Sequence, residues 1–563
     1  MDKVFYDFLE TGNYQLAADL LEEKLVSPDK IAMVLSTLPE PHAVGTCRAM
    51  DSGLLADVLV LLDTETQQIV IDGLQDRALD EVMDEMTLSE STNLIQELPT
   101  DVALRIADEE DIVALLRTRK YATLKPMLAR MNPVDASRVF DELDEAESLM
   151  LFRLFPKDLA AEVFVELDTE RQQALIERLN NVEVRAVMGE LFVDDVVDVI
   201  EEMPANVVKR MLAQSDENTR MYVNEILRYP KDSAGSIMTV EFVSLRPEMT
   251  VDEAEEKIRR TAIDNETIYT CYVVDNKNYL LGIVTAKQLL LSDRKQLISD
   301  IMIINPVYAH TTDDREKAAQ LLTEHGFLAI PVVDDETRLV GIVTVDDAID
   351  VLQEENTEDI AKMAAVKPSD KPYLKTSVWA IYRNRIPWLL VLMVSATFTG
   401  LILNTYEQKL ALISTVLFAC VPMIMDTGGN AGSQASVTVI RSLALGELNT
   451  KDVFRVLWKE VRVSFLLGIS LAVACFAKLM LIDNLLFGYK DYTVYTCVVV
   501  ALALLCTVVI AKLVGCLLPL LAKKLRLDPA VVASPFITTI VDALSLILYC
   551  GLAVGMLGPS VVD

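Results

Sequence analysis

The sequence predicts a multidomain membrane protein with three parts: a duplicated α-helical superhelical domain at the N-terminus, a paired α/β module, and an all-α domain of five transmembrane helices. Three observations predict this order: a division of charge along the chain, two internal repeats and five long apolar runs. The 563 residues are too many for one ordinary core. A hydrophobic content of 52% and a mean hydropathy of +0.31 coexist with a net charge of −33, so these properties belong to different regions.

Charge divides the chain into an acidic body and an apolar, weakly basic tail. Residues 371–563 contain 10 Asp/Glu and 16 Lys/Arg, net +6, which leaves 74 and 35, net −39, for residues 1–370. An acidic body repels nucleic acid, because phosphate neutralisation needs clustered Lys and Arg. Cations are therefore the expected partners, and nucleic acid is not.

Other classes of protein receive little support. The eight cysteines form no CxxC pair, so we expect neither a disulfide framework nor a zinc site. The three histidines stand apart and no GxSxG, HExxH or GxxxxGKS/T motif is present, which favours a protein that is not an enzyme. The first residues are charged and helix-like, without an apolar signal segment, which predicts a cytoplasmic body.

The N-terminal domain is predicted from a repeat with an offset of 105 residues. Residues 62–74 recur as residues 167–179 with eight identities in 13 positions. In the second copy Glu-Leu pairs recur every 24 residues, a spacing that suits short stacked helices that bury one another's apolar stripes. We predict an α-solenoid with one copy at residues 1–120 and another at residues 121–230, most of whose carboxylates form a solvated outer face.

A second repeat, with an offset of 59, begins after residue 230, where short β-rich runs alternate with helices. Residues 272–285 are matched by residues 331–344, with Val-Val-Asp and Gly-Ile-Val-Thr segments in both. These segments resemble a tandem pair of CBS domains, which we place at residues 234–294 and 295–353. The resemblance implies a βαββα regulatory module that binds adenine nucleotides or couples an effector to a partner domain.

Five apolar runs of about 20 residues or more follow, which is the length that crosses a hydrocarbon core of about 30 Å. Lys and Arg gather before the first run and in the second and fourth connections, which places these segments on the cytoplasmic side. We expect a plasma-membrane protein with a cytosolic body and an external C-terminus. The transmembrane domain is predicted at residues 386–563, with spans at residues 386–406, 410–440, 463–482, 492–511 and 529–562.

Prolines and glycines interrupt the second and fifth runs. Proline removes an amide donor and glycine loosens the helix, so we expect some carbonyl oxygens to face a cavity, as is typical of an ion path. The carbonyls concerned are those near Pro422, Gly428, Gly429, Pro529 and Pro535.

Asp542 lies within the fifth run, where an ionised carboxylate costs about 3 kcal/mol unless water or a cation meets it. Three interpretations stay open: a site for a transported ion, a structural ion pair with Lys478 or Lys512, and a neutral carboxyl. Asp426 in the second run is a weaker candidate.

The chemistry of this path favours Mg²⁺. Carbonyl oxygens, Asn430, Thr538, Thr539 and one carboxylate per subunit suit a hard cation that keeps most of its water, which describes Mg²⁺ better than Ca²⁺ or a soft metal.

A further acidic cluster stands at the exit from the second CBS copy. On a continuous helix most of its acids share one side, and they repel one another unless cations bind between them. A solvated face is the alternative. The following connecting helix, predicted at residues 354–385, leads into the first span, so a bound ion would act on that span. The acids are Asp347, Asp350, Glu355, Glu358 and Asp359.

With these residues in place, the chain resembles the MgtE family of Mg²⁺ channels over nearly its whole length. The most specific segments are Pro-x5-Gly-Gly-Asn-x-Gly-x-Gln at residues 422–434 and Asp-Pro-Ala-x4-Pro-x2-Thr-x3-Asp at residues 528–542. The resemblance implies a homodimer whose second and fifth spans line a pore, with hydrated Mg²⁺ at Asp542. The pore-lining positions so implied are Pro422, Gly428, Gly429, Asn430, Gly432, Gln434, Pro535, Thr538 and Thr539.

The resemblance also implies feedback, since the family closes its pore when cytosolic Mg²⁺ bridges carboxylates of the N domain, the CBS pair and the connecting (plug) helix. Some relatives imply ATP at the CBS pair. The extra N-terminal copy departs from the family pattern. The matching sensor acids are Asp314, Glu316, Asp347, Asp350, Glu355, Glu358 and Asp359, with Glu162, Asp194 and Asp198 as weaker matches.

We therefore predict a Mg²⁺ channel for uptake across the plasma membrane, gated closed by cytosolic Mg²⁺. One alternative is an ion-coupled secondary transporter of Mg²⁺ or other divalent cations, in which Lys478 and Lys512 serve a coupling path. Another is a membrane-anchored nucleotide sensor without flux.

Overall fold

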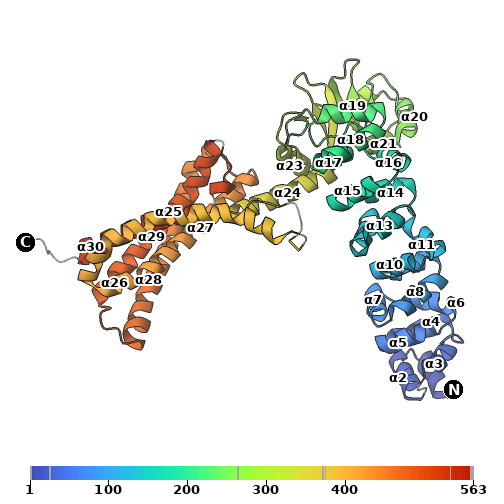
Figure 1. Ribbon diagram of the computed structural model, residues 1–563, viewed down its shortest axis with the longest axis horizontal. Helices are drawn as coiled ribbons and strands as arrows, with labels where there is room; N and C mark the ends of the chain where they lie inside the picture. The colour runs from blue at the N-terminus through green and yellow to red at the C-terminus, as the bar shows by residue number, and fades with distance from the viewer. Residues whose placement is uncertain are drawn as a thin grey trace, which may run out of the picture. The chain divides into compact units, whose positions relative to one another are not determined.

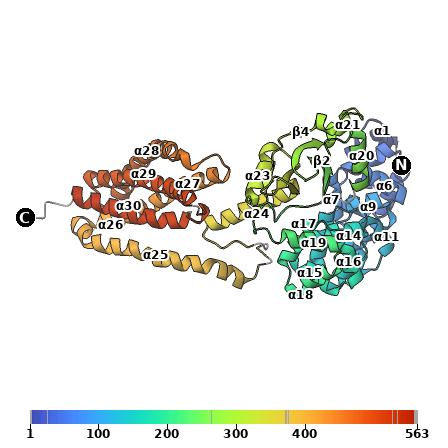
Figure 2. The same cartoon turned by 90° about the horizontal axis from the view of Figure 1, so that it is seen from above.

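The computed structural model describes residues 3–24, 27–262, 265–369, 373–374, 376–525, 527–532 and 534–557. The chain forms two compact units, residues 1–348 and residues 349–563. The predicted fold class is confirmed: a helical N domain, a pair of α/β domains with two sheets, and a helical apolar domain (Figures 1 and 2).

Short helices, most of seven to eleven residues, build the N domain, and each packs mainly on helices one or two positions away in the chain. Its helices are α1 (Lys3–Glu10), α2 (Tyr14–Lys24), α3 (Pro28–Leu35), α4 (Glu40–Ala49), α5 (Ser52–Leu59), α6 (Thr64–Gly73), α7 (Asp76–Asp84), α8 (Leu88–Glu97), α9 (Thr100–Ile106), α10 (Glu109–Arg117), α11 (Tyr121–Leu128), α12 (Pro133–Val139), the 3-10 turn η1 (Phe140–Glu142), α13 (Glu145–Phe152), α14 (Lys157–Val165), α15 (Thr169–Arg178), α16 (Asn181–Met188), α17 (Val193–Glu202), α18 (Ala205–Gln214) and α19 (Glu217–Ile226).

The repeated segment of the N domain has the same local structure in both copies. Asp63 and Asp168 are the N-caps of α6 and α15, and each accepts the amide of the residue three positions later, at 3.0 and 2.9 Å. Gln67 and Gln172 are buried and each donates at 3.0 Å to a carbonyl of the preceding helix. In both copies the recurring Asp therefore caps its helix, and the recurring Gln joins that helix to the one before it.

The CBS pair contains two sheets with equivalent pairing. The first has the order β1-β2-β3-β4 and the second β5-β6-β7. Tyr272 pairs with Ile283 in the first sheet, and Pro331 pairs with Ile342 in the second, which keeps the offset of 59. The elements are β1 (Phe242–Leu245), α20 (Val251–Thr261), β2 (Thr267–Val274), β3 (Leu280–Thr285), α21 (Ala286–Leu291), α22 (Ile298–Ile301), β4 (Ile303–Ile304), β5 (Ala309–His310), α23 (Arg315–His325), β6 (Ala329–Val333), β7 (Leu339–Thr344) and α24 (Val345–Met363).

Long apolar helices form the C-terminal domain. Among the described residues, four helices are long and apolar enough to cross a membrane, and α27 is a fifth long helix whose glycines and polar residues make it less apolar. Both ribbon views show α27, α28, α29 and α30 side by side (Figures 1 and 2). The helices are α25 (Val378–Ile413), α26 (Thr415–Ala419), α27 (Val421–Ala444), the 3-10 turn η3 (Thr450–Asp452), α28 (Val453–Ala477), the π-helical segment η4 (Lys478–Leu486), α29 (Val494–Lys524), the 3-10 turn η5 (Ala530–Val532) and α30 (Ser534–Leu557).

Candidate metal-ion sites

Helix α27 has one exposed polar face. Asp426, Asn430 and Gln434 are four residues apart, so they share one side of the helix, and all three are exposed. Pro422 begins the same face as one of the first two residues of the helix and is also exposed. A membrane helix with such a face needs water, protein or an ion beside it.

The predicted second span is interrupted just before Pro422, where α26 ends at Ala419 and α27 begins at Val421, but the interruption expected at the glycines is wrong. Helix α27 runs continuously from Val421 to Ala444, and Gly428, Gly429 and Gly432 are buried within it. A Cβ atom at Gly428 would lie 2.8 Å from Ser545 Oγ of α30. Glycine is required here because α27 packs closely on its neighbours, as small residues permit in membrane bundles.

Asp542 lies on α30 directly beside this glycine-rich segment. A Cβ atom at Gly429 would be 3.5 Å from Asp542 Oδ1 and 3.4 Å from Thr538 Cγ2. Asp542, Thr538 and Thr539 are all half-buried. Asp426 is near enough to Asp542 for the two carboxylates to interact electrostatically. Oxygen atoms of α27 and α30 thus converge along one side of the bundle.

Neither candidate lysine pairs with Asp542. Lys478 Nζ lies 2.6 Å from Asp483, and Lys512 Nζ lies 3.5 Å from Glu460 in a largely buried pair. In the described part of the chain no Lys or Arg forms an ion pair with Asp542. The structural ion-pair interpretation of Asp542 is therefore wrong for both lysines.

The prolines of the fifth span lie at its start. Pro529 precedes η5, and Pro535 is in the first turn of α30, although its side chain lies outside what the structure describes. Proline is tolerated in a first turn, where its missing amide has no intrahelical partner.

The second candidate site joins the N domain to the CBS pair. Asp194 and Asp195 at the start of α17 interact electrostatically with Asp347 at the start of α24, and with Glu241 and Glu266 of the first CBS domain. We call Asp194, Asp195, Glu241, Glu266, Asp346 and Asp347 the N–CBS acid cluster.

Burial and mutual repulsion shift these carboxyl groups away from their ionised forms. Burial, followed by the charge of Asp347, raises the pKa of Asp195 to about 7. Burial, followed by Asp195 and its acidic neighbours, raises the pKa of Glu266 to about 8, and one oxygen of Glu266 is buried without a hydrogen-bond partner. Burial and then Asp347 also raise the pKa of Asp194 well above its ordinary value. The cluster therefore has a strong requirement for protons or for a cation.

One of these acids, Glu241, joins the N domain to the CBS pair without a metal. Glu241 accepts Thr239 Oγ1 at 2.7 Å and also receives the backbone amide of Val193 at the N-terminus of α17. Asp347 accepts Thr344 Oγ1 at 2.5 Å. A carboxylate at a helix N-terminus is stabilised by the helix dipole, so Glu241 favours docking of α17 on the CBS pair.

The connecting segment begins with one continuous helix, α24. The five acids predicted to act together on it lie beside different neighbours at its two ends. Asp347 joins the N–CBS acid cluster, whereas Glu358 and Asp359 lie near the C-terminal end of the helix, beside Lys362. Lys362 Nζ lies 2.8 Å from Glu358 and 2.7 Å from Asp528, in the link before α30. Burial opposes the charged ammonium, but hydrogen bonds to Asp528 and Glu358 outweigh it and raise the pKa of Lys362.

The remaining predicted sensor acids have other positions. Asp314 is the N-cap of α23 and accepts the Glu316 amide at 2.9 Å, and Glu316 accepts Gln320 at 3.0 Å. Neither is among the principal electrostatic neighbours of Asp194 or Glu266. Four acids of the predicted set are exposed, and Glu355 is half-exposed on α24. The exposed acids are Glu162, Asp198, Asp314 and Asp350.

Sequence reasoning missed Asp195, Glu241, Glu266 and Asp346. Asp195 and Asp346 are adjacent in sequence to the predicted acids Asp194 and Asp347. The sequence does not show which helix face meets the CBS pair, so it could not identify them as members of the cluster. Glu241 and Glu266 border β1 and β2, and no spacing in the chain connects them. Within the described residues, no three carboxylate, imidazole or thiolate side chains converge closely enough to ligate one ion directly.

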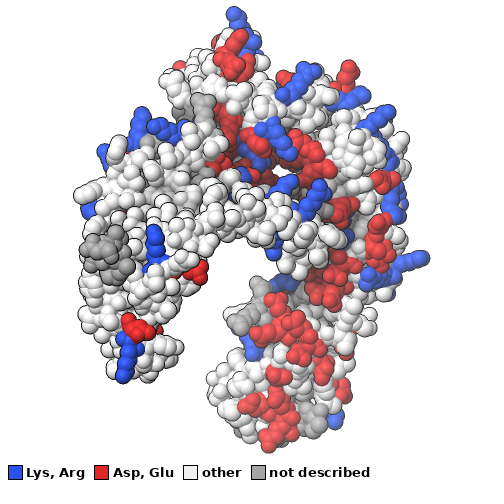
Figure 3. All heavy atoms as spheres, turned by 60° about the vertical axis from the view of Figure 1, so that its left-hand side comes forward, with Lys and Arg blue, Asp and Glu red and all other residues white. Residues whose placement is uncertain are grey.

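Charge separates the surfaces of the two parts. The space-filling view shows acidic side chains gathered over the N-terminal helices, and few charges on the apolar helices (Figure 3). A membrane bundle with one polar face, attached to an acidic body with a CBS pair, is the arrangement of a membrane transport protein with a regulatory body.

Comparisons with known proteins agree with this class. Residues 421–552 match the MgtE divalent cation transporter domain, residues 26–121 and 131–232 each match the MgtE intracellular N domain, and residues 234–294 and 298–354 match the CBS domain. Magnesium transporter MgtE of Thermus thermophilus is 37% identical over 434 residues, covering 76% of this chain and 94% of the relative. Magnesium transporter MgtE of Bacillus subtilis is 31% identical over 443 residues, covering 78% and 96%. The chain belongs to the MgtE family of magnesium transporters, as its motifs predicted.

Two solved structures resemble the N-terminal part. The crystal structure of the cytosolic domain of the Mg²⁺ channel MgtE in complex with ATP is 37% identical and covers 43% of this chain and 99% of that one, with a TM-score of 0.41. The crystal structure of the soluble part of a magnesium transporter is 26% identical and covers 48% and 99%, with a TM-score of 0.42.

Proposed function

We propose that this chain carries Mg²⁺ across the plasma membrane along the polar face of α27 and past Asp542 of α30. The observation that carries the proposal is a half-buried carboxylate without a lysine partner, beside a helix face of Asp426, Asn430 and Gln434. Oxygen ligands of this kind suit Mg²⁺, which binds through one or two carboxylates and keeps several waters. Asp542 therefore contacts the ion through its hydration shell or replaces one water.

A second copy of the chain completes the passage in this proposal. The polar face of α27 is exposed in one protomer, and a polar face in contact with lipid is unfavourable. A homodimer about this face covers both copies and places two Asp542 carboxylates along one path. The positive-inside distribution of Lys and Arg puts the body in the cytosol and the C-terminus outside.

Cytosolic Mg²⁺ closes the passage by binding the N–CBS acid cluster. Hydrated Mg²⁺ between Asp194, Asp195 and Asp347 neutralises their repulsion and favours the docked N domain. Feedback of this kind requires Mg²⁺ to bind the docked state better than the separated one. Helix α24 then links the cluster to the membrane domain, since its two ends carry Asp347 and Glu358. ATP is the second ligand that we propose, at the CBS pair, as in the ATP complex of the relative's cytosolic domain.

A channel is favoured over an ion-coupled transporter by the pairing of the lysines. Lys478 and Lys512, the residues available for a coupling path, are both held in ion pairs away from Asp542. Unitary currents in planar bilayers distinguish the two mechanisms, because a coupled transporter gives none that are resolvable. The polar face of α27 argues against a nucleotide sensor without ion flux, because helices that only anchor a protein in the membrane do not need such a face.

The test is Mg²⁺ flux into liposomes that contain a Mg²⁺-sensitive dye and the purified full chain. We expect Asp542→Asn to reduce the rate to that of protein-free liposomes. The matched control is Asp491→Asn, which neutralises an exposed acid before α29 and should keep the parent rate. Parent-like flux in Asp542→Asn would exclude this passage.

A further inference from the structure

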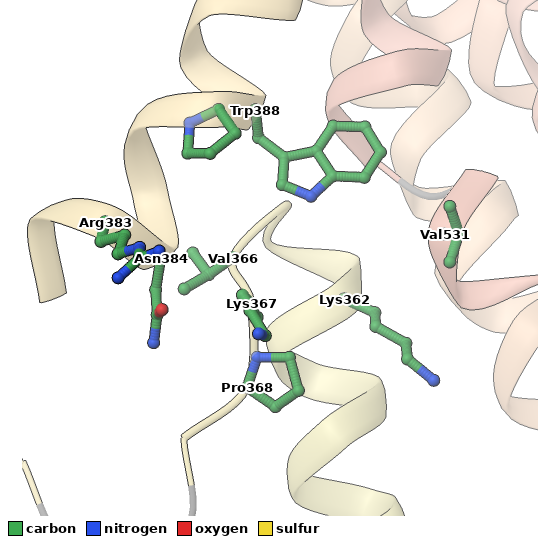
Figure 4. Close-up of a pocket in the computed structure, with 9 residues that line it drawn as sticks. Lys362, Val366, Lys367, Pro368, Arg383, Asn384, Trp388 and Val531 are labelled. Carbon is green, nitrogen blue, oxygen red and sulfur yellow. The ribbon is translucent and has the colours of Figure 1, made fainter. Parts of the chain in front are cut away.

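A cavity of about 290 Å³ lies within the membrane unit, between the end of the connecting helix, the start of α25 and the link before α30 (Figure 4). Most of its surface is apolar, and in the close-up the Trp388 ring extends from α25 toward Val531. Its lining residues are Lys362, Val366, Lys367, Pro368, Arg383, Asn384, Pro387, Trp388 and Val531. No acidic side chain is among these described lining residues.

Two of the three cations at this cavity have no acid partner in the described part of the chain. Lys362 is neutralised by Glu358 and Asp528. Lys367 and Arg383 are exposed, and no described ion pair involves them. The Lys367 amide donates to the Asn384 carbonyl at 3.1 Å, which joins the link after α24 to helix α25 at the rim. Among the described residues, the cavity therefore has an apolar wall and a rim whose cations Lys367 and Arg383 have no acidic partner.

The position of the cavity along α25 corresponds to a membrane interface. Trp388 and Pro387 stand at the start of the apolar run that begins at residue 386, while Arg383 is one turn earlier. Exposed Trp379 and Tyr382 precede them on the same helix. Aromatic rings gather at the level of lipid head groups, and cations on the cytoplasmic side meet the anionic leaflet.

We propose that this cavity binds the head group of an anionic phospholipid. The lipid phosphate lies between Lys367 and Arg383, and the first part of an acyl chain lies along Pro387 and Trp388. A soluble phosphate shares the first contact but has nothing to cover the apolar wall, which is why the wall favours a lipid. A bound lipid would hold the connecting segment against α25, because its contacts come from both. This inference does not depend on the proposed passage for Mg²⁺.

The test uses the full chain with Trp379→Phe and Trp458→Phe, which leaves Trp388 as its one tryptophan. The protein is reconstituted in phosphatidylcholine vesicles that contain one of two brominated lipids, phosphatidylglycerol or phosphatidylcholine. Both carry bromine near the head-group end of the acyl chains. Quenching of Trp388 then reports which lipid occupies the cavity. We expect a preference for phosphatidylglycerol of at least about fivefold, or about 1 kcal/mol in total, which is the contribution of a single cation near an anionic surface.

Variants of Lys367 and Arg383 test whether these two cations cause the preference for phosphatidylglycerol. Lys367→Gln with Arg383→Gln should reduce the ratio to about one, while Lys367→Arg with Arg383→Lys should restore it because charge is kept. The control is Lys459→Gln on α28, an exposed lysine away from the cavity, which should leave the ratio at the parent value. A parent ratio near one, or an unchanged ratio in the double Gln variant, would overturn the proposal. Loss of the preference in millimolar inorganic phosphate would also overturn it, because it would identify a soluble phosphate as the ligand.

Discussion

The two acidic sites of this chain differ in the crowding of their carboxylates. In the membrane domain, Asp542 lies beside Thr538 and has one acidic neighbour, Asp426. In the N–CBS acid cluster, buried Asp194 is surrounded by four further acids. A site in a passage must let its ion leave, so few charges suffice. A sensor must favour one conformation strongly, and crowded charges that separate without a cation provide that difference.

The two ends of α24 differ in the same way, because only the C-terminal end carries a lysine, Lys362, between its acids. At the C-terminal end of α24, the acids Glu358 and Asp528 are bridged by a lysine and do not need a metal ion. At the N-terminal end, no Lys or Arg is among the principal charged neighbours of Asp194, Asp195 or Glu266. The requirement for an added cation is thus concentrated at one end of the helix.

The largest expected effect tests the packing that places the membrane site. In Gly515→Val the new side chain meets the Gly432 backbone of α27, so α27 and α29 must separate. Overpacking of this kind costs about 3 kcal/mol, and displacement of α27 also moves its polar face away from Asp542. We expect a markedly lower unfolding temperature in detergent and loss of Mg²⁺ flux. Gly551→Val on α30 is the control, because its Cβ meets nothing within 4 Å. Equal stability of the two variants would contradict the close α27–α29 contact.

The next effect tests the crowding of the sensor. Asp195→Asn with Glu266→Gln removes two carboxylate charges from the N–CBS acid cluster, so Mg²⁺ has fewer ligands there and should bind the docked state more weakly. We expect the Mg²⁺ midpoint for protection of the α17 amides in hydrogen exchange to rise about tenfold, within the usual range of coupling between sites. Asp158→Asn with Glu190→Gln neutralises two exposed acids of the same domain and is the control. An unshifted midpoint in the cluster variant would remove these acids from the sensor.

A smaller effect is expected from pH in Mg²⁺-free buffer. The pKa of Asp195 is raised to about 7 and that of Glu266 to about 8, so the docked state binds protons more tightly than the separated state. Docking is therefore most stable below the ordinary carboxyl range and weakens as the pH rises through 7 and 8. Between pH 6 and 8.5, α17 amide protection, corrected for the intrinsic exchange rate, should fall by about tenfold per pH unit for each proton released. Saturating Mg²⁺ should abolish this dependence, and protection that increases with pH would show the opposite linkage.

The smallest effect is expected at the lysine bridge. Lys362→Gln removes two partly exposed ion pairs, each of which contributes about 0.2–1 kcal/mol at most. We expect a local increase of hydrogen exchange at the C-terminal end of α24 of a few fold, largest at low salt. Lys362→Arg keeps the charge and should retain the parent rate. If Mg²⁺ then restores protection in Lys362→Gln, the lysine substitutes for a metal ion at Glu358 and Asp528; if it does not, these acids have no part in metal sensing.

The sequence by itself determined the order of the domains, both repeats and the family, and it singled out Asp542 as a candidate ion site. These features depend on local chemistry: Asp63 and Asp168 cap helices within a few residues, the 59-residue offset preserves one strand register, and long apolar runs need no tertiary contacts to be recognised. Periodicity and capping are short-range properties, so one chain displays them directly.

Only the tertiary structure decided which residues meet. It brought Glu241 and Glu266 to Asp195, divided the α24 acids between its two ends, and placed Lys478 and Lys512 in pairs away from Asp542. It also showed that Gly428 and Gly432 allow close helix packing and leave α27 unbroken. The physical reason is that electrostatic and packing energies depend on distances through space, and the separation of residues along a chain does not specify those distances.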